Sequence, residues 1–328
     1  MEVPARRPAP LLFGLLAVTA ASLAAGLALG SLPLGVDQLF DALSGRGDPL
    51  LARIVTELRL PRVLAAFAVG GLLALSGVLM QVLLRNPLAD PYVLGTSGGA
   101  AVAALGLMLL GLSGWVINLG AFAGALGAVL LVFALAGPQR RGDPTRMLLT
   151  GIILAAGWGA LIAFLLTLSP PGRVQGMLFW LMGDLAQAWQ PGAALWLLLL
   201  LTVAGLLLAR PIDLMVRGDR SAAALGVPVT RLRPLLYLIA SAATATAVGL
   251  AGSVGFIGLI VPHLLRLAGA RGHRLLLPAS VLGGGSLLVL ADAAARNLMA
   301  PMQLPVGILT ALIGVPLFLF LLLRSRSC

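Results

Sequence analysis

Residues 218–228 read GDRSAAALGVP and form a short amphipathic insert between two long apolar runs. Three successive alanines favour a helix, and Gly226 can end it because glycine readily adopts the left-handed conformation of a C-terminal cap. A helix this short is not stable alone in water and needs a surface to pack on. We therefore interpret the segment as a docking element for a soluble partner. The alternative is a solvated connector within the wider insert 210–233, where Pro211 and Pro228 bracket the helical run.

The composition is that of a membrane protein. Hydrophobic residues make up 60% of the 328 residues and charged residues 10%, with a mean hydropathy of +1.06, whereas soluble proteins carry about 25% charged residues. With 41 Gly and 21 Pro we expect kinked or broken helices. Small residues at helical spacing predict close helix contacts at Gly120, Gly124, Gly252, Gly255 and Gly258. A membrane helix needs about 20 mostly apolar residues, and the predicted spans are 11–30, 63–84, 92–111, 116–136, 147–168, 191–209, 235–252, 256–268, 275–292 and 305–323.

The net charge of +11 and the pI near 11.7 raise the question of nucleic-acid binding, and the placement of the arginines answers it. If the N-terminus is cytoplasmic, 16 of the 22 arginines fall on the inner side with five acids, while the outer side carries six arginines and six acids. This is the positive-inside bias, so we expect lipid and no nucleic acid around the chain, with both chain ends in the cytoplasm. Arg6 and Arg7 before an apolar stretch also resemble a cleaved signal peptide. However, the stretch 11–30 exceeds the roughly 7–15 residues of a signal core, so we expect the first helix to remain.

The chemistry that the sequence lacks narrows the function. No residue is Lys, which excludes a phosphate-binding loop of the GxxxxGK[ST] type, and no catalytic constellation is visible. His263 and His273 have no further ligands at metal spacing, so we expect no metal site and a solvated His273. Asp184 and Asp292 lie near predicted outer ends where water can reach them, so no chain of proton carriers crosses the membrane. A transporter driven by a separate ATPase is therefore favoured over an ion-coupled secondary carrier, and an enzyme is not expected.

Two further segments are long enough to display function. The outer loop 31–62 contains LFDALSG, which predicts a short surface helix stopped by Gly45. Residues 169–190 begin with a Pro–Pro–Gly break and continue with an apolar segment that is too short to cross a membrane. This segment is either a re-entrant helix or an interfacial helix anchored by Trp180 and Trp189.

Seven ordered segments carry a family resemblance: RLPR from Arg59, GLLALSGVLMQVLLRNPLADPYVLGTSGGAA from Gly71, LGVPV from Leu225, GFIGLIVPHLLR from Gly255, HRLLLP from His273, LAD from Leu290 and LPVGILTALIGVPLFLFLL from Leu304. They resemble the membrane-spanning permease of bacterial ABC importers for cobalamin, iron–siderophore complexes and haem. The resemblance covers nearly the whole chain. It implies one permease domain over 1–328 with the type II ABC importer permease fold, which has about ten transmembrane helices.

The resemblance also implies how such a subunit works. It would sit in the bacterial inner membrane and pass its cargo along an interface with a second copy of itself. Two cytoplasmic ATPase subunits and a periplasmic substrate-binding protein would serve it. ATP and Mg would bind to the ATPase, and this chain would hold no cofactor. We expect an iron–siderophore complex or cobalamin as the cargo, ahead of haem, although the sequence does not identify which of them it is.

Site residues follow from the same resemblance. Arg59, Arg62 and Arg296 match outer arginines that meet acidic residues of the binding protein; the alternative role is helix-end anchoring. A cytoplasmic gate maps to Pro144 and Thr145, although the proline departs from the small polar pair of the best-known members. The residues implied to couple the permease to the ATPase are Gly218, Asp219, Arg220, Ala223, Leu225, Gly226, Val227 and Pro228.

Overall fold

The computed structural model describes residues 8–30, 32, 34–136, 144–186, 188, 190–300 and 302–325, and the regular structure in this part is entirely helical. The elements in chain order are α1 (Pro8–Ala28), α2 (Val36–Leu43), α3 (Pro49–Arg53), η1 (Ile54–Arg59), α4 (Leu60–Leu83), η2 (Pro91–Leu94), α5 (Thr96–Leu109), α6 (Trp115–Ala136), α7 (Pro144–Leu168), α8 (Pro171–Leu181), α9 (Gly192–Leu207), α10 (Ala209–Val216), α11 (Asp219–Ala224), α12 (Val229–Ala251), α13 (Ile257–Leu267), α14 (His273–Asn297) and α15 (Val306–Ser325).

Every predicted span contains a helix. Within the described ranges, six helices are long and apolar enough to cross a membrane: α1, the continuous α3–η1–α4 rod, α6, α7, α12 and α14. α9 and α10 form a pair bent by 61°, and α5, α13 and α15 are shorter apolar helices. A proline lies inside each of α12, α13, α14 and α15. The expectation of broken or proline-interrupted helices is confirmed.

The outer segment 31–62 is more helical than the sequence predicts. α2 begins three residues earlier than expected and ends where Gly45 adopts a φ of +69°. The next helix starts at Pro49, because the Asp48 carboxylate caps its first turn with a 2.8 Å hydrogen bond and proline fits that turn. The wider π turn of η1 precedes Pro61, which lacks the N–H needed for a regular α-helical bond. The rod therefore continues unbroken into α4.

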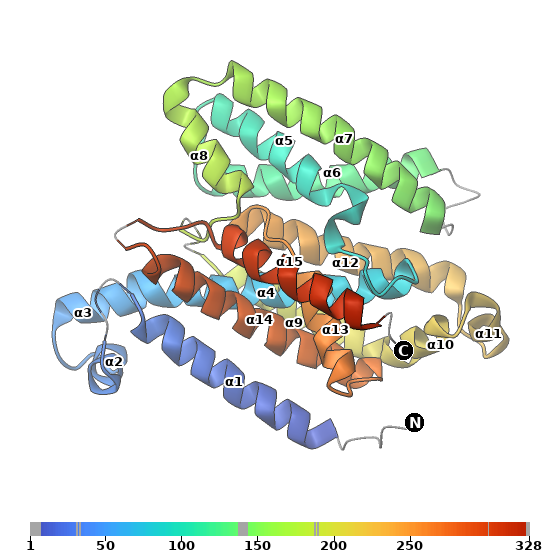
Figure 1. Ribbon diagram of the computed structural model, residues 1–328, viewed down its shortest axis with the longest axis horizontal. Helices are drawn as coiled ribbons and strands as arrows, with labels where there is room; N and C mark the ends of the chain where they lie inside the picture. The colour runs from blue at the N-terminus through green and yellow to red at the C-terminus, as the bar shows by residue number, and fades with distance from the viewer. Residues whose placement is uncertain are drawn as a thin grey trace.

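The core is built around α4. Of its most apolar stretch 89% is buried inside the chain, and α9, α12, α13 and α14 pack around it (Figure 1). Glycines allow these backbones to touch: a Cβ at Gly70 would lie 2.2 Å from the carbonyl oxygen of Gly284, and one at Gly77 would lie 1.9 Å from that of Gly258. Any larger residue there would push α14 or α13 away from α4.

The predicted close contacts at small residues are confirmed at four of the five glycines. A Cβ on Gly120, Gly124, Gly252 or Gly258 would lie within 2.5 Å of a neighbouring atom. Gly255 faces open space, so packing does not require a glycine there.

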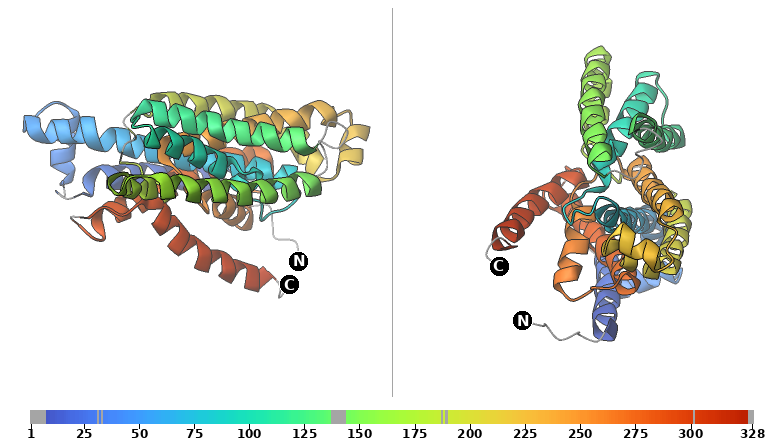
Figure 2. Two further views of the ribbon diagram at one scale, coloured as in Figure 1. Left: turned by 90° about the horizontal axis from the view of Figure 1, so that it is seen from above. Right: turned by 90° about the vertical axis from the view of Figure 1, so that its right-hand side faces the viewer.

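A second layer holds α5, α6, α7 and α8 (Figure 1). It joins the core through α12, which packs on both α6 and α4. α7 is the least covered long helix, with 6% of its most apolar stretch buried. On the other side of the molecule α15 leans outward from its contacts with α13 and α14 (Figure 2). Both helices leave broad apolar faces uncovered within this chain.

The two ends of the bundle differ. α11, the start of α1 and the end of α15 gather at one end, and α2 and α3 lie at the other (Figures 1 and 2). The first and last long helices therefore meet the insert at one end of the bundle.

The segment 169–190 forms the short helix α8, which begins directly after the predicted Pro–Pro break. The chain then returns to the core, where the N–H of Asp184 donates to the carbonyl oxygen of Ala251 at 2.9 Å. Trp180 packs against a small apolar cluster of α5, α6 and α12, and Trp189 lies outside the described residues. The short helix is confirmed, and its depth in the bilayer stays a prediction.

Candidate functional site

The insert folds into two short helices with a sharp turn between them. α11 follows α10 after Gly218, whose φ of +116° suits glycine. The N–H groups of Gly226 and Val227 donate to the carbonyls of Ala223 and Ala222, each at 3.0 Å, which is the Schellman arrangement. The predicted cap at Gly226 is confirmed by its φ of +83°.

The residues implied in coupling divide into an inward and an outward set. Asp219 points to the core, and Val227 is 8% exposed beneath α11. Leu225 is 64% exposed at the tip of the insert, where a partner protein can cover it. The outward set is Arg220, Ala223, Leu225, Gly226 and Pro228.

Asp219 attaches α11 to two core helices. Its carboxylate accepts hydrogen bonds from Nη2 of Arg233 on α12 at 2.9 Å and pairs with Nη2 of Arg85 at 2.6 Å. The Arg233 side chain is 7% exposed, and its Nη1 donates to the carbonyl of Leu83 at the end of α4, at 3.1 Å. Arg85 has a φ of +49°, a conformation that non-glycine residues rarely adopt outside functional sites. These contacts tie α11 to the end of α4 and to the start of α12.

His273 is not solvated, so that prediction is wrong. It is 4% exposed, and its Nδ1 lies 2.5 Å from Oδ1 of Asp213. The backbone N–H of His273 also donates to this oxygen, at 3.1 Å. Asp213 belongs to α10, so it satisfies the first turn of α14 from outside. The insert is thus fixed to the core at a second place, which no local pattern in the sequence indicates.

Asp90 lies between α4 and α5 in an environment that disfavours its charge. Its Oδ1 accepts a 2.8 Å hydrogen bond from the N–H of Tyr92 and caps η2. Desolvation outweighs this bond and raises the pKa of Asp90 to about 6, from an ordinary value of 3.8. Because the pKa of Asp90 is higher in the folded than in the unfolded protein, the folded protein binds a proton more tightly between pH 3.8 and about 6. Protonation of Asp90 therefore favours the folded state fully below pH 3.8, and this contribution to stability is lost as the pH rises through about 6.

Replacing Asp90 by Asn is expected to remove this loss, since asparagine keeps the cap without the charge. At pH 7 the variant gains about 1–2 kcal/mol over the wild type, and the gain vanishes below about pH 4. Thermal unfolding of the purified protein across this pH range measures it. Asp48→Asn, at an exposed capping aspartate, is the matched control. Equal stability of Asp90→Asn and wild type at pH 7 would contradict the raised pKa.

The three outer arginines lie together. Arg59, Arg62 and Arg296 line one cavity of about 610 Å³. Nη1 of Arg59 donates to the carbonyls of Leu27 and Ala28 at 2.7 and 3.1 Å, and Arg296 reaches the same end of α1 with a 2.9 Å bond. Cations at a helix C-terminus stabilise its free carbonyls. Two of the arginines thus hold the end of α1, and docking of a partner by the three stays a prediction.

Asp292 is not accessible to water, so that prediction is wrong as well. It is 1% exposed and accepts hydrogen bonds from Nε and Nη2 of Arg62 at 3.1 and 2.9 Å. Nε of Arg296 lies 3.1 Å from its other oxygen. The acid is buried because α1 and α4 pack against α14 at this height. Two guanidinium groups therefore hold this carboxylate in place near the end of α14.

The two predicted gate residues stand at the start of a long helix. α7 begins at Pro144, followed by Thr145, and residues 137–143 before them lie outside the described residues. Their role as a gate stays a prediction. In the described part of the chain, no group of three or more His, Cys, Asp or Glu is arranged to hold a metal ion.

Sequence reasoning gave no role to three residues of these clusters, Arg85, Arg233 and Asp213, and it did not predict the pairing of Asp292. Each is a charge at or near the end of an apolar run. Burying a charge at such a position costs free energy unless the charge is paired. The position of these charges was therefore the signal in the sequence that they have partners. The partners themselves lie far away in sequence and follow from helix packing.

The fold and its two ends define a class of protein. It is a helical protein with several helices of membrane-spanning length. One end of its bundle carries an insert that is anchored to the central helix and has an exposed apolar tip, and three arginines line a cavity elsewhere on the bundle.

Comparisons with known proteins agree with this class. The model of the FecCD transport family matches residues 16–324. The vitamin B12 import system permease proteins BtuC of Salmonella paratyphi A and Citrobacter koseri are each 39% identical, over 87% of this chain and 87% and 86% of the relatives. The solved structure of a metal-chelate type ABC transporter in an inward-facing conformation has a TM-score of 0.84 at 31% identity, covering 97% of this chain and 100% of that one. PsaBC from Streptococcus pneumoniae, with a TM-score of 0.55 at 16% identity over 87% of this chain and 95% of that one, shares the fold alone.

The chain belongs to the FecCD transport family. It has the type II ABC importer permease fold that the sequence predicts, and it is a permease of the ABC importer class.

Proposed function

We propose that this chain is the transmembrane half of an inner-membrane importer for an iron–siderophore complex or cobalamin, ahead of haem. It pairs with a second copy and works with two cytoplasmic ATPase subunits and a periplasmic binding protein. ATP hydrolysis belongs to the partner. The observation that carries the proposal is α11: an outward apolar tip on a helix whose inward carboxylate is bound to α4 and α12.

The orientation follows from charge. The end of the bundle that holds α11 also holds the start of α1 and the end of α15. In the topology predicted from the sequence, most arginines belong to this side. The positive-inside bias supports a cytoplasmic location for both chain ends and for α11.

The second copy is proposed to cover the faces of α7 and α15. Both helices expose large apolar side chains, among them Ile153 at 72% and Phe164 at 59% on α7, and Leu312 at 66% and Leu323 at 68% on α15. A cargo path between two such faces would be wide and apolar, which suits a bulky chelate. Pro144 and Thr145 at the inner end of α7 fit a gate on that path.

The cargo assignment draws on similarity. The BtuC relatives carry vitamin B12 in their names, and the inward-facing neighbour is described as a metal-chelate type transporter. Affinity purification of the tagged chain from its native membrane, with mass spectrometry, tests the whole proposal. A co-purifying ATPase and a bound corrinoid or ferric siderophore are the expected result. A chain that purifies alone and transports with an ion gradient would overturn it.

Gly226→Arg is expected to uncouple ATP hydrolysis from transport. A residue with a side chain at φ +83° strains the Schellman turn by about 1–3 kcal/mol, and the new cation enters the docking surface. Transport should fall roughly tenfold with normal membrane insertion. Gly114→Arg is the control, because Gly114 has a φ of +65° and open space in the α5–α6 turn. Normal transport by Gly226→Arg would count against docking at α11.

Arg62→Gln is expected to weaken capture of the loaded binding protein roughly tenfold at low salt and less at high salt. Reversal of Arg59 or Arg296 would disturb the end of α1, which both hold. Arg62 also holds Asp292, so Gln is chosen at position 62 because it can still donate a hydrogen bond to that carboxylate, which keeps Arg296 as its counter-charge. Arg53→Gln is the control, as the Arg53 side chain is 73% exposed beside Glu57 outside the cavity. Binding and its salt dependence can be followed by surface plasmon resonance. If Arg62→Gln and Arg53→Gln bound the loaded binding protein with equal affinity, the cavity arginines would keep only the role of anchoring helix ends.

A further inference from the structure

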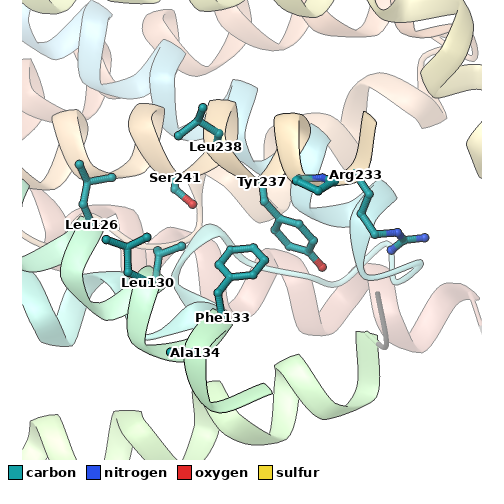
Figure 3. Close-up of a pocket in the computed structure, with 10 residues that line it drawn as sticks. Leu126, Leu130, Phe133, Ala134, Arg233, Tyr237, Leu238 and Ser241 are labelled. Atoms are coloured by element: carbon teal, nitrogen blue, oxygen red, sulfur yellow. The ribbon is translucent and has the colours of Figure 1, made fainter. Parts of the chain in front are cut away.

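A groove lies between α6 and α12, on the side of the molecule away from α15 (Figures 2 and 3). Its cavity measures about 520 Å³ and is almost wholly apolar. Leu130 of α6 and Leu238 of α12 stand at its rim with 68% and 62% exposure. Both helices are of membrane-spanning length. It is lined by Leu126, Val129, Leu130, Phe133, Ala134, Arg233, Pro234, Tyr237, Leu238 and Ser241.

Two buried hydroxyl groups of α12 face this groove. Ser241 is 4% exposed and Tyr237 is 1% exposed, and neither hydroxyl oxygen has a hydrogen-bond partner. Figure 3 shows both side chains projecting toward Leu130 and Phe133 of α6. The Arg233 guanidinium is close enough to act on the Tyr237 hydroxyl, so Ser241 is the hydroxyl group of the two that lacks any neighbouring partner. Buried hydroxyl groups are normally paired, so Ser241 points to an absent acceptor beside this apolar channel.

A cation stands at the inner end of the groove. Arg231 is exposed and precedes Pro234 by three residues, which places it on the same face of α12. It forms no ion pair with any described residue, whereas Arg233 beside it is occupied by Asp219 and by the carbonyl of Leu83. The Tyr237 side chain leans toward the N-terminus of its helix, and therefore toward Arg231. From the proposed inner face outward, the groove thus presents first the Arg231 cation, then the Tyr237 hydroxyl and then the apolar channel.

We propose that this groove is a binding site for one anionic phospholipid of the inner leaflet. An acyl chain lies between α6 and α12, an ester carbonyl accepts a hydrogen bond from Tyr237 or Ser241, and the phosphate pairs with Arg231. Arginine next to an anionic leaflet attracts such headgroups. The inference rests on the membrane-spanning class of the chain and on the proposed orientation, and it does not depend on the cargo or the ATPase. A bound lipid would also contact Pro234 and Arg233, the turn of α12 that holds α11.

The experiment is native mass spectrometry of the detergent-purified chain, incubated with equal amounts of phosphatidylglycerol and phosphatidylcholine. We expect one retained lipid, with phosphatidylglycerol favoured at least fivefold. Ala134→Phe fills the groove and should reduce retention at least fivefold. Ala123→Phe, on an exposed part of α6 outside the groove, should not. Arg231→Gln should abolish the preference for phosphatidylglycerol, while Arg274→Gln, at another exposed inner arginine, should keep it.

Ser241→Ala supplies a second readout that holds even if Ala134→Phe folds poorly. Removing an unpaired hydroxyl should raise the melting temperature of the lipid-free protein and at the same time lower lipid retention. Equal retention by Ala134→Phe and Ala123→Phe, or equal retention of the two lipids by the wild type, would overturn the proposal. Cross-linking from position 134 to a second copy or to another polypeptide in the native membrane would also overturn it.

Discussion

Asp219→Asn is expected to reduce ATP-driven transport at least tenfold while the protein still inserts in the membrane. Asparagine keeps the shape of the side chain but removes the charge that holds Arg233 and Arg85. Arg233, 7% exposed, is then left without its counter-charge. Because the Asp219 side chain itself is 39% exposed, the loss is about 1–2 kcal/mol and falls below that of a fully buried pair. That energy is enough to let α11 move independently of α4 and α12.

A double-mutant cycle separates this effect from general damage. Arg233→Gln added to Asp219→Asn should cost little more than either change alone, because both remove the same interaction. Transport into proteoliposomes containing the partner ATPase, together with ATP hydrolysis, gives the readout. Continued hydrolysis without transport is the expected pattern. Additive losses, or normal transport by Asp219→Asn, would show that this ion pair does not transmit movement.

Asp292→Asn is expected to destabilise the protein by about 3–5 kcal/mol, the largest effect among these predictions. The change leaves two guanidinium groups without a counter-charge at a place where Arg62 is 14% and Arg296 9% exposed. Removing one side of a buried ion pair costs more than removing the pair, because the remaining charge stays desolvated. We therefore expect a strongly lowered melting temperature and poor accumulation in the membrane.

The compensating variant is Asp292→Asn combined with Arg62→Gln. It removes one of the stranded cations and should recover a substantial part of the lost stability. Asp41→Asn, at an exposed outer acid, is the control and should change the melting temperature little. Thermal unfolding in detergent compares the four proteins. If Asp292→Asn alone were as stable as the wild type, water would have to reach this site and hydrate Arg62 and Arg296 in place of the lost carboxylate.

Asp292 and Asp219 stand at opposite ends of the central helix α4, and each is shared by two arginines. Arg62 near the start of α4 shares Asp292 with Arg296, and Arg85 just after its end shares Asp219 with Arg233. Between them α4 is almost entirely buried and apolar. Ion pairs of fixed geometry at its two ends set the position of α4 along its axis, which the apolar contacts between helices specify less sharply.

The sequence by itself determined the class, the approximate spans and the insert. Apolar stretches of membrane length, separated by Gly and Pro, leave few structures other than helices, since backbone groups in lipid must be satisfied locally. The cap at Gly226 was predictable for a similar reason: a glycine after three alanines gives a local stop signal. The length of the α3–η1–α4 rod was not predictable from the sequence, because Pro61 indicates a helix break there. The π turn of η1 avoids this break.

Only the tertiary structure decided which charges meet. His273 and Asp292 look accessible in the linear chain, but their partners stand 60 and 230 residues away, on α10 and on α4. Burial and pairing of a side chain depend on which helix covers it, and ten helices of similar composition can be packed in many orders. The sequence specifies the helices through local hydrogen bonding and hydropathy, whereas long-range packing places the charged ends beside one another and so builds both candidate sites.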